Sequence, residues 1–208
     1  RKSAPQLRKL RRGKVYSPSP IPFHLQAAMI VCIMGVALAV PFLKPWVARK
    51  LVHVGVGCLL VHSDLEDWKL RWAVYAVTVV TFVVCTGKLK RYVRFLHQDM
   101  RVDPGITTYV ATCSVCCLFR IPFVSIAPLF FADPMGAIVG RNVVSPRIYG
   151  KKTLAGTLAV VGTAFLTLPD PSVSNRCIAA AMIGGIELVA GDLDNPSIAA
   201  FLISRAAM

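Results

Sequence analysis

Carboxylates interrupt two otherwise apolar segments of the sequence, and these are the residue types best suited to chemistry. One segment, PLFFADPMGAIVGRNV, contains Asp133. The other, IGGIELVAGDLDNPSIAAF, contains Glu187, Asp192, Asp194 and Asn195. An Asp inside a membrane span costs about 2.5–3.5 kcal/mol on insertion scales, so an acid retained there indicates function. Gly and Pro residues allow the second segment to break, and a broken helix with clustered carboxylates suits a cation or phosphate site.

Basic, hydroxyl and glycine residues at the starts of three apolar segments form a second group of candidates. They are Arg49, Lys50 and His53; Arg101, Asp103, Gly105 and Tyr109; and Lys151, Lys152, Thr153, Gly156 and Thr157. Exposed N–H groups and the helix dipole favour anions at helix N-termini, so this combination suits a polyphosphate. Plainer explanations exist for the individual residues. Arg49 and Lys50 alone could be snorkelling anchors, and Gly156 and Thr157 could pack helices together.

Hydropathy predicts that these residues are positioned by membrane-spanning helices. The 208 residues are 55% hydrophobic and 16% charged, with a mean hydropathy of +0.61, which is more apolar than an ordinary soluble domain. A helical span needs about 20 mostly apolar residues. Apolar segments lie near residues 24–43, 51–62, 70–86, 105–119, 121–143, 153–168 and 177–203. We therefore predict an all-α polytopic membrane protein of about six to seven transmembrane helices, some short or broken.

The charge pattern supports this layout and argues against nucleic-acid binding. Although the net charge is +14, apolar segments divide the Lys and Arg residues into short clusters rather than one face. If every segment crosses, most basic residues, Arg205 included, fall on one membrane face, while Asp170 falls on the other. Residues 1–22 form a basic, Pro-rich tail ahead of a transmembrane domain at 23–208. The Arg-rich, acid-free start of the tail is similar to the remnant of an organelle-targeting sequence.

Five motifs occur in order along the transmembrane domain. They are RKLVH (49–53), DPGITTY (103–109), DPMGAIVGR (133–141), GKKTLAGTLA (150–159) and IELVAGDLDN (186–195). Together they resemble the CTP-dependent lipid-alcohol kinase family, which includes phytol kinase, dolichol kinase and yeast-type diacylglycerol kinase. The resemblance covers most of residues 45–200. The chain departs from the family pattern at Ala132, where Gly is usual, and at Pro134, where Gly or another small residue is common.

The resemblance implies a kinase that transfers a phosphoryl group from CTP, or from ATP, to an isoprenoid alcohol or diacylglycerol. Catalytic roles would fall to Asp133, Lys152 and Glu187, with Glu187 accepting or orienting the hydroxyl proton and Lys152 paired with Asp133. Mg²⁺ would be held by Asp133, Asp194 and Asp192. The residues expected to bind the nucleotide phosphates are Arg49, Lys50, Gly140, Arg141, Thr153, Gly156 and Asn195.

A second function remains open on the same observations. The chain could be a non-catalytic subunit, derived from this kinase family, of a large organellar membrane complex such as a respiratory or photosynthetic assembly. The motif departures and the basic tail fit this alternative, whereas the buried carboxylates favour the enzyme. The expected partners are membrane lipid and the lipid alcohol, or the other subunits of such a complex, and no nucleic acid. The expected location is the mitochondrial inner membrane, a plastid membrane or the endoplasmic reticulum.

Overall fold

The computed structural model describes residues 21–39, 44–86 and 104–208, and they are mostly helical. Their eight α-helices are α2 (Phe23–Ala39), α3 (Pro45–Val61), α4 (Trp68–Thr86), α5 (Pro104–Phe119), α6 (Ala127–Asn142), α7 (Leu154–Thr167), α8 (Val173–Val189) and α9 (Asp194–Ala207). The short elements are 3-10 turns η2 (Phe123–Ile126) and η3 (Gly191–Leu193), and the antiparallel strands β1 (Arg147–Tyr149) and β2 (Lys152–Thr153). The predicted all-α class is confirmed; most of the predicted tail lies outside the described residues.

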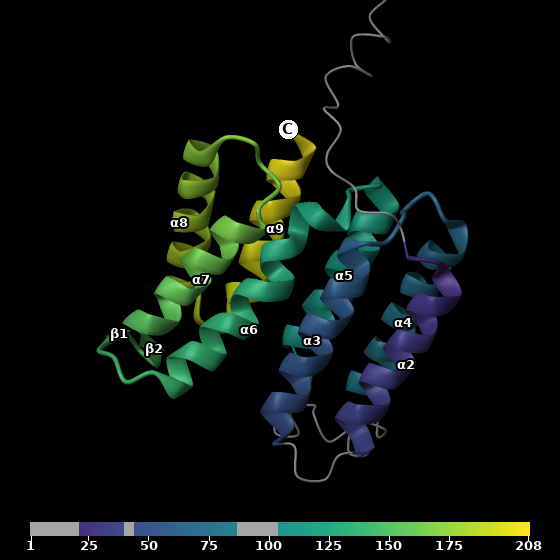
Figure 1. Cartoon of the computed structure of the whole chain (residues 1–208), viewed down its shortest axis with the longest axis horizontal. Helices are drawn as coiled ribbons and strands as arrows, with labels where there is room; N and C mark the ends of the chain where they lie inside the picture. The colour runs from purple at the N-terminus through teal and green to yellow at the C-terminus, as the bar shows by residue number, and fades with distance from the viewer. Residues whose placement is uncertain (1–20, 40–43, 87–103) are drawn as a thin grey trace, which may run out of the picture.

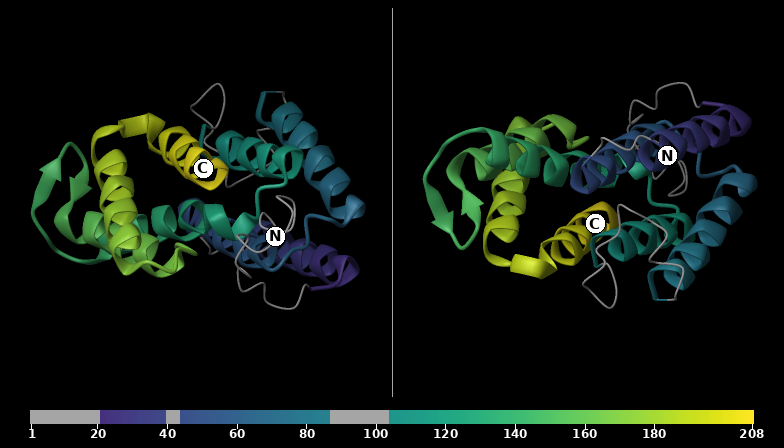
Figure 2. Two further views of the ribbon diagram at one scale, coloured as in Figure 1. Left: turned by 90° about the horizontal axis from the view of Figure 1, so that it is seen from above. Right: turned by 90° about the horizontal axis from the view of Figure 1, so that it is seen from below.

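The helices run up and down the molecule, so their connections gather at two ends (Figure 1). The β1–β2 hairpin between α6 and α7 and the turn at 190–193 lie at one end, which we call the hairpin end. The connections 62–67, 120–126 and 168–172 lie at the opposite end. Viewed from above and below, α6 and α9 lie between α2–α5 on one side and α7–α8 on the other (Figure 2). Helix α6 contacts α3, α7 and α9, which gives it a central position.

Glycines bring α6 and α7 into close contact. A Cβ atom at Gly156 of α7 would lie 3.0 Å from the carbonyl oxygen of Gly136 and 3.2 Å from the Cα atom of Gly140, both on α6. Small residues at this spacing allow helix backbones to approach closely. The contact holds the start of α7, and with it the preceding strand β2, against the final turns of α6.

The substitution Gly156→Ala should therefore destabilise the fold, although alanine is the better helix former. The added methyl group would meet backbone atoms, which cannot move aside as a flexible side chain can, so we expect a loss of about 1–3 kcal/mol in the free energy of unfolding. Gly162→Ala in the same helix is a matched control, because nothing lies within 4 Å of its Cβ position, and it should be neutral or stabilising by up to about 1 kcal/mol. Thermal unfolding in detergent measures both. Equal midpoints for the two variants would contradict this account.

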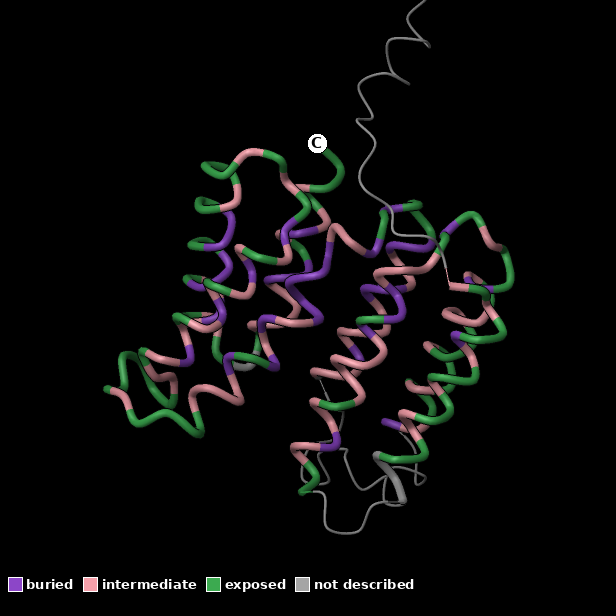
Figure 3. Tube along the Cα trace, in the orientation of Figure 1, coloured by how far each residue is buried: buried purple, intermediate pink, exposed green. Residues whose placement is uncertain are grey.

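Two helical segments are long and apolar enough to cross a membrane, Trp68–Cys85 and Phe123–Asn142. The first buries few of its residues within the protein, and it exposes apolar side chains along its length, among them Trp72, Val79 and Val83. Buried positions gather instead on α3 and on α5–α9, while α2 and α4 are exposed over much of their surface (Figure 3). Three cysteines of α5, Cys113, Cys116 and Cys117, are buried in this core.

The last predicted span, 177–203, is two helices rather than one. Helix α8 ends at Val189, Gly191 adopts a φ of +57° in the left-handed region that glycine tolerates, and α9 returns beside α8. As a result Arg205, in the last turn of α9, forms an ion pair with Asp170 at the end opposite the hairpin. The charge pattern had assigned these two residues to opposite faces, and that assignment is wrong because the chain reverses once more than predicted.

Candidate functional site

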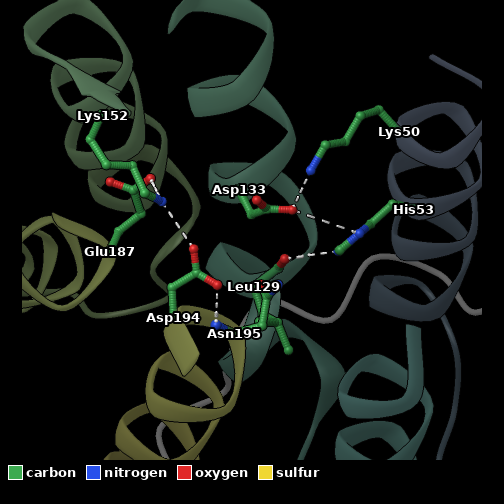
Figure 4. Close-up of polar contacts among 8 residues, drawn as sticks. All are labelled: Lys50, His53, Leu129, Asp133, Lys152, Glu187, Asp194 and Asn195. Atoms are coloured by element: carbon green, nitrogen blue, oxygen red, sulfur yellow. Dashed lines mark hydrogen bonds and ion pairs between the residues drawn. The ribbon is translucent and has the colours of Figure 1, made fainter. Parts of the chain in front are cut away.

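The first part of the site is an ion pair between α3 and α6. Lys50, in the second turn of α3, donates from Nζ to Oδ2 of Asp133, in the middle of α6, across 2.5 Å (Figure 4). Both side chains are mostly buried. His53 lies one turn further along α3, with Nδ1 4.0 Å from the same carboxylate oxygen. Its Nε2 lies 3.1 Å from the carbonyl oxygen of Leu129 and donates to it, because a carbonyl oxygen can only accept.

The α6 helix is locally weakened where it presents Asp133. Pro134 follows inside the helix, and proline has no N–H to donate to the carbonyl group four residues earlier. The His53 contact to the Leu129 carbonyl therefore lies beside a gap in the helical hydrogen-bond ladder. Tyr109 of α5 supports His53 from the other side: the two rings meet edge to face with centroids 4.4 Å apart, and the Tyr109 hydroxyl donates to the His53 carbonyl oxygen at 3.3 Å.

The second part of the site joins one lysine to two carboxylates. Nζ of Lys152 donates to Oε1 of Glu187 at 2.5 Å and to Oδ2 of Asp194 at 3.0 Å (Figure 4). Burial by itself lowers the pKa of Lys152, but the hydrogen bonds and charges of the two carboxylates outweigh burial and raise that pKa above its ordinary value of 10.5. Lys152 is therefore a cation throughout the neutral pH range.

Local structure explains how these three residues meet. Lys152 lies in β2, where it pairs with Tyr149 of β1. The next residue, Thr153, caps α7 by accepting a hydrogen bond from the backbone N–H of Gly156 at 3.2 Å. Glu187 is in the last turn of α8, and Asp194 begins α9 directly after the reversal. The hairpin and the α8–α9 turn are both at the hairpin end, so their polar residues converge there.

Two buried oxygen atoms in this second part have no hydrogen-bond partner among the described residues. They are Oε2 of Glu187 and Oδ1 of Asn195. Glu187 as a whole is only 9% exposed, and leaving a buried acceptor unpaired costs about 1–3 kcal/mol. Because both atoms are acceptors, a cation or a hydroxyl donor would satisfy them. The second part of the site is therefore suited to a ligand that supplies positive charge or O–H groups.

The two parts of the site are neighbours but share no ion pair among the described residues. Lys50 pairs with Asp133, whereas the ion pairs of Lys152 are with Glu187 and Asp194. In Figure 4, Asp133 lies between the Lys50–His53 side and the Lys152–Glu187–Asp194 side. Residues from α3, α6, β2, α8 and α9 thus surround a common region that contains both cations and anions.

The oxygen donors of the site are of the kind that Mg²⁺ prefers, but they are divided between the two parts. Over residues 21–39, 44–86 and 104–208, no group of three or more His, Cys, Asp or Glu side chains lies close enough together to hold a metal ion. Asp133 and Asp194 are instead neutralised by different lysines. The side chain of Asp192, the third predicted ligand, lies outside the described part of the structure.

The structure corrects one predicted pairing and explains several other candidates. Lys152 was expected to pair with Asp133, and this is wrong because the hairpin directs Lys152 to α8 and α9, while α3 supplies Lys50 to Asp133. The other predicted binding residues lie as follows: Gly140, Thr153 and Gly156 form the α6–α7 contact, Arg49 precedes Lys50 on α3, and Arg141 stacks on a ring.

That ring belongs to Trp46, a residue the sequence analysis missed. The guanidinium carbon of Arg141 lies 4.5 Å from its centroid, a cation–π geometry that ties the end of α6 to the start of α3. A tryptophan beside a proline at a helix start carries no signal of this role, because nothing in the sequence shows which cation it will meet.

Comparison of the chain with protein-family models, with curated proteins and with solved structures finds no match.

Proposed function

We propose that the chain is a polytopic membrane protein in which α2–α8 supply six to seven crossings, and that it phosphorylates a lipid alcohol at the hairpin end. The single observation that carries the proposal is the set of mostly buried carboxylates from three helices, Asp133, Glu187 and Asp194, held beside two lysines with Glu187 Oε2 left unpaired. A lipid-embedded protein has little reason to retain so many buried charges without a function for them.

The chemistry would be phosphoryl transfer from CTP or ATP to an isoprenoid alcohol or diacylglycerol. The alcohol oxygen would form a bond to the γ-phosphorus as the bond to the nucleoside diphosphate oxygen breaks, and Glu187 Oε2 would accept the hydroxyl proton. Lys50 and Lys152 would turn from their carboxylates to the phosphate oxygens. Mg²⁺, held by Asp133 and Asp194, would supply charge neutralisation when bound. Arg49 and Arg141 lie at the same end of α3 and α6 and would add positive charge there.

The alternative, a non-catalytic subunit of an organellar membrane complex, is favoured by a different observation. Each described carboxylate of the site already contacts a lysine, so two lysines offset most of the charge of the three carboxylates without any ligand. These ion pairs could hold α3 against α6, and the hairpin against α8 and α9, in a purely structural protein. Buried ion pairs of this kind fix geometry more reliably than they add stability.

One experiment on purified protein distinguishes the lipid-alcohol kinase from the structural subunit. The labelled γ-phosphate of CTP or ATP should appear on phytol, dolichol or diacylglycerol in detergent, and chelation of Mg²⁺ should stop the transfer. A folded protein that transfers label to none of the three alcohols, and that purifies in fixed ratio with many other subunits, would replace the enzyme with the structural alternative. Release of the protein from membranes by alkaline carbonate would contradict the polytopic arrangement itself.

A further inference from the structure

The connection between α6 and α7 carries an exposed mixture of apolar and basic side chains. Val144 is completely exposed, and Ile148 and Tyr149 are exposed to about half their area, at 47% and 59%. Arg147 and Lys151 are exposed beside them, and residues 141–154 contain no acid. The β1–β2 hairpin projects sideways from the start of α7, at the edge of the molecule (Figures 1 and 2). None of these five residues takes part in the site described above.

An isolated two-stranded hairpin is marginal in water, and exposed Val, Ile and Tyr side chains are poorly placed there. The same mixture is well suited to the boundary between lipid headgroups and acyl chains, where Tyr is enriched and Arg and Lys reach phosphate groups. The hairpin follows directly on the apolar segment Phe123–Asn142, which is long enough to cross a bilayer. The position of the hairpin and its composition therefore both indicate the membrane interface.

We propose that residues 143–151 form an interfacial anchor that binds the anionic lipid surface at the hairpin end. Val144, Ile148 and Tyr149 enter the boundary region, while Arg147 and Lys151 contact lipid phosphates. Positive charge without compensating acid is the complement of an anionic leaflet. The inference depends on a membrane location for the chain and not on phosphoryl transfer.

The anchor has a direct connection to the site, because both include residues of the β1–β2 hairpin. Lys151 and Lys152 are adjacent: Lys151 is exposed, and Lys152 reaches inward to Glu187 and Asp194. A hairpin held on the lipid surface thus fixes the position from which Lys152 bridges α8 and α9.

The test uses the full chain in nanodiscs of phosphatidylcholine alone or of equal parts phosphatidylcholine and phosphatidylglycerol. A nitroxide label is placed at Val144→Cys, with the three exposed cysteines Cys32, Cys58 and Cys177 changed to serine. A label at Ser174→Cys, exposed at the opposite end of the molecule, is the control. The Val144 label should gain collisions with oxygen and lose collisions with a water-soluble nickel complex in the anionic nanodiscs, and the Ser174 label should not respond.

Removing the charges of Arg147 and Lys151 then tests whether these two residues cause the response to anionic lipid. The double substitution Arg147→Gln with Lys151→Gln should reduce the preference for the anionic surface by roughly 25-fold, at about fivefold for each basic residue near an anionic leaflet. Equal nickel accessibility at position 144 in the two lipid compositions would overturn the proposal. That is the result expected if the hairpin remained in water or docked on another protein. A lipid response that survives the double substitution would overturn the role of the two cations.

Discussion

Asp133→Asn should reduce phosphoryl transfer by about three orders of magnitude or more, equivalent to roughly 4 kcal/mol of transition-state stabilisation. The substitution keeps the shape of the side chain but removes the negative charge that would hold Mg²⁺. It also leaves Lys50 without its anionic partner. Because both side chains of this pair remain 20% exposed, the loss of stability should be smaller than the 3–5 kcal/mol typical of a fully buried pair, at about 1–2 kcal/mol.

A second variant separates activity from folding. Lys50→Met combined with Asp133→Asn removes both charges, so the free energy of unfolding should recover most of the loss while activity stays absent. Glu66→Gln is the control, since Glu66 pairs with Arg120 at 3.1 Å on an exposed surface at the opposite end, where such pairs contribute little. Measurement is by transfer of labelled γ-phosphate and by thermal unfolding of the same preparations. Unchanged transfer in Asp133→Asn would place the chemistry elsewhere.

Lys152→Met should produce the largest loss of stability among single substitutions in the site. It leaves the carboxylates of Glu187 and Asp194, now without their shared cation, facing each other in a mostly buried region. We expect a loss of about 2–4 kcal/mol in the free energy of unfolding, discounted for the 28% exposure of the Lys152 side chain. Lys151→Met is the matched control, because Lys151 is adjacent to Lys152 in the chain but is exposed, and the substitution should change stability by less than about 0.5 kcal/mol.

Adding Glu187→Gln to Lys152→Met should restore part of the loss by removing one of the two like charges.

The pH dependence of stability in the wild type gives an independent check on Lys152. Since the pKa of Lys152 is raised in the folded state, its contribution to stability is complete below the ordinary value of 10.5 and is lost only as the pH rises through the folded pKa. If the wild type lost stability between pH 6 and pH 9, and Lys152→Met abolished that loss, Lys152 would be losing its proton in this range, which would contradict the raised pKa. Equal unfolding midpoints for Lys151→Met and Lys152→Met would contradict the contribution of Lys152 to stability.

The sequence was sufficient to predict the helical class and the residue types of the site. Long apolar segments and the acids within them follow from local composition, and the segment predicted at 121–143 is helical in the structure, with a turn and helix at Phe123–Asn142. The pairing of Lys50 with Asp133 could not be predicted, because it depends on how α3 and α6 register against one another. That register is decided by side-chain packing between distant parts of the chain, which hydropathy does not record.

The reversal of the chain before α9 is a second feature that hydropathy could not predict. Hydropathy is continuous from 177 to 203, so the segment was predicted as one span with a break inside it. The position of the break rests on Gly191, and one glycine is not enough to distinguish a kink from a complete turn. The direction of α9 in turn determines where Arg205 lies. One local backbone choice therefore changed the side of the molecule to which a distant charge belongs.

Helix α9 is fastened at both of its ends. Asp194, its first residue, pairs with Lys152, and Arg205, in its last turn, pairs with Asp170. Asp194 and Arg205 are eleven positions apart, which is about 16 Å along the helix axis. A helix that is held by ion pairs at both ends is restrained from pivoting about either end. The Arg205–Asp170 ion pair therefore restrains the helix that carries Asp194. The orientation of this acid of the site is set partly by an ion pair at the other end of the molecule.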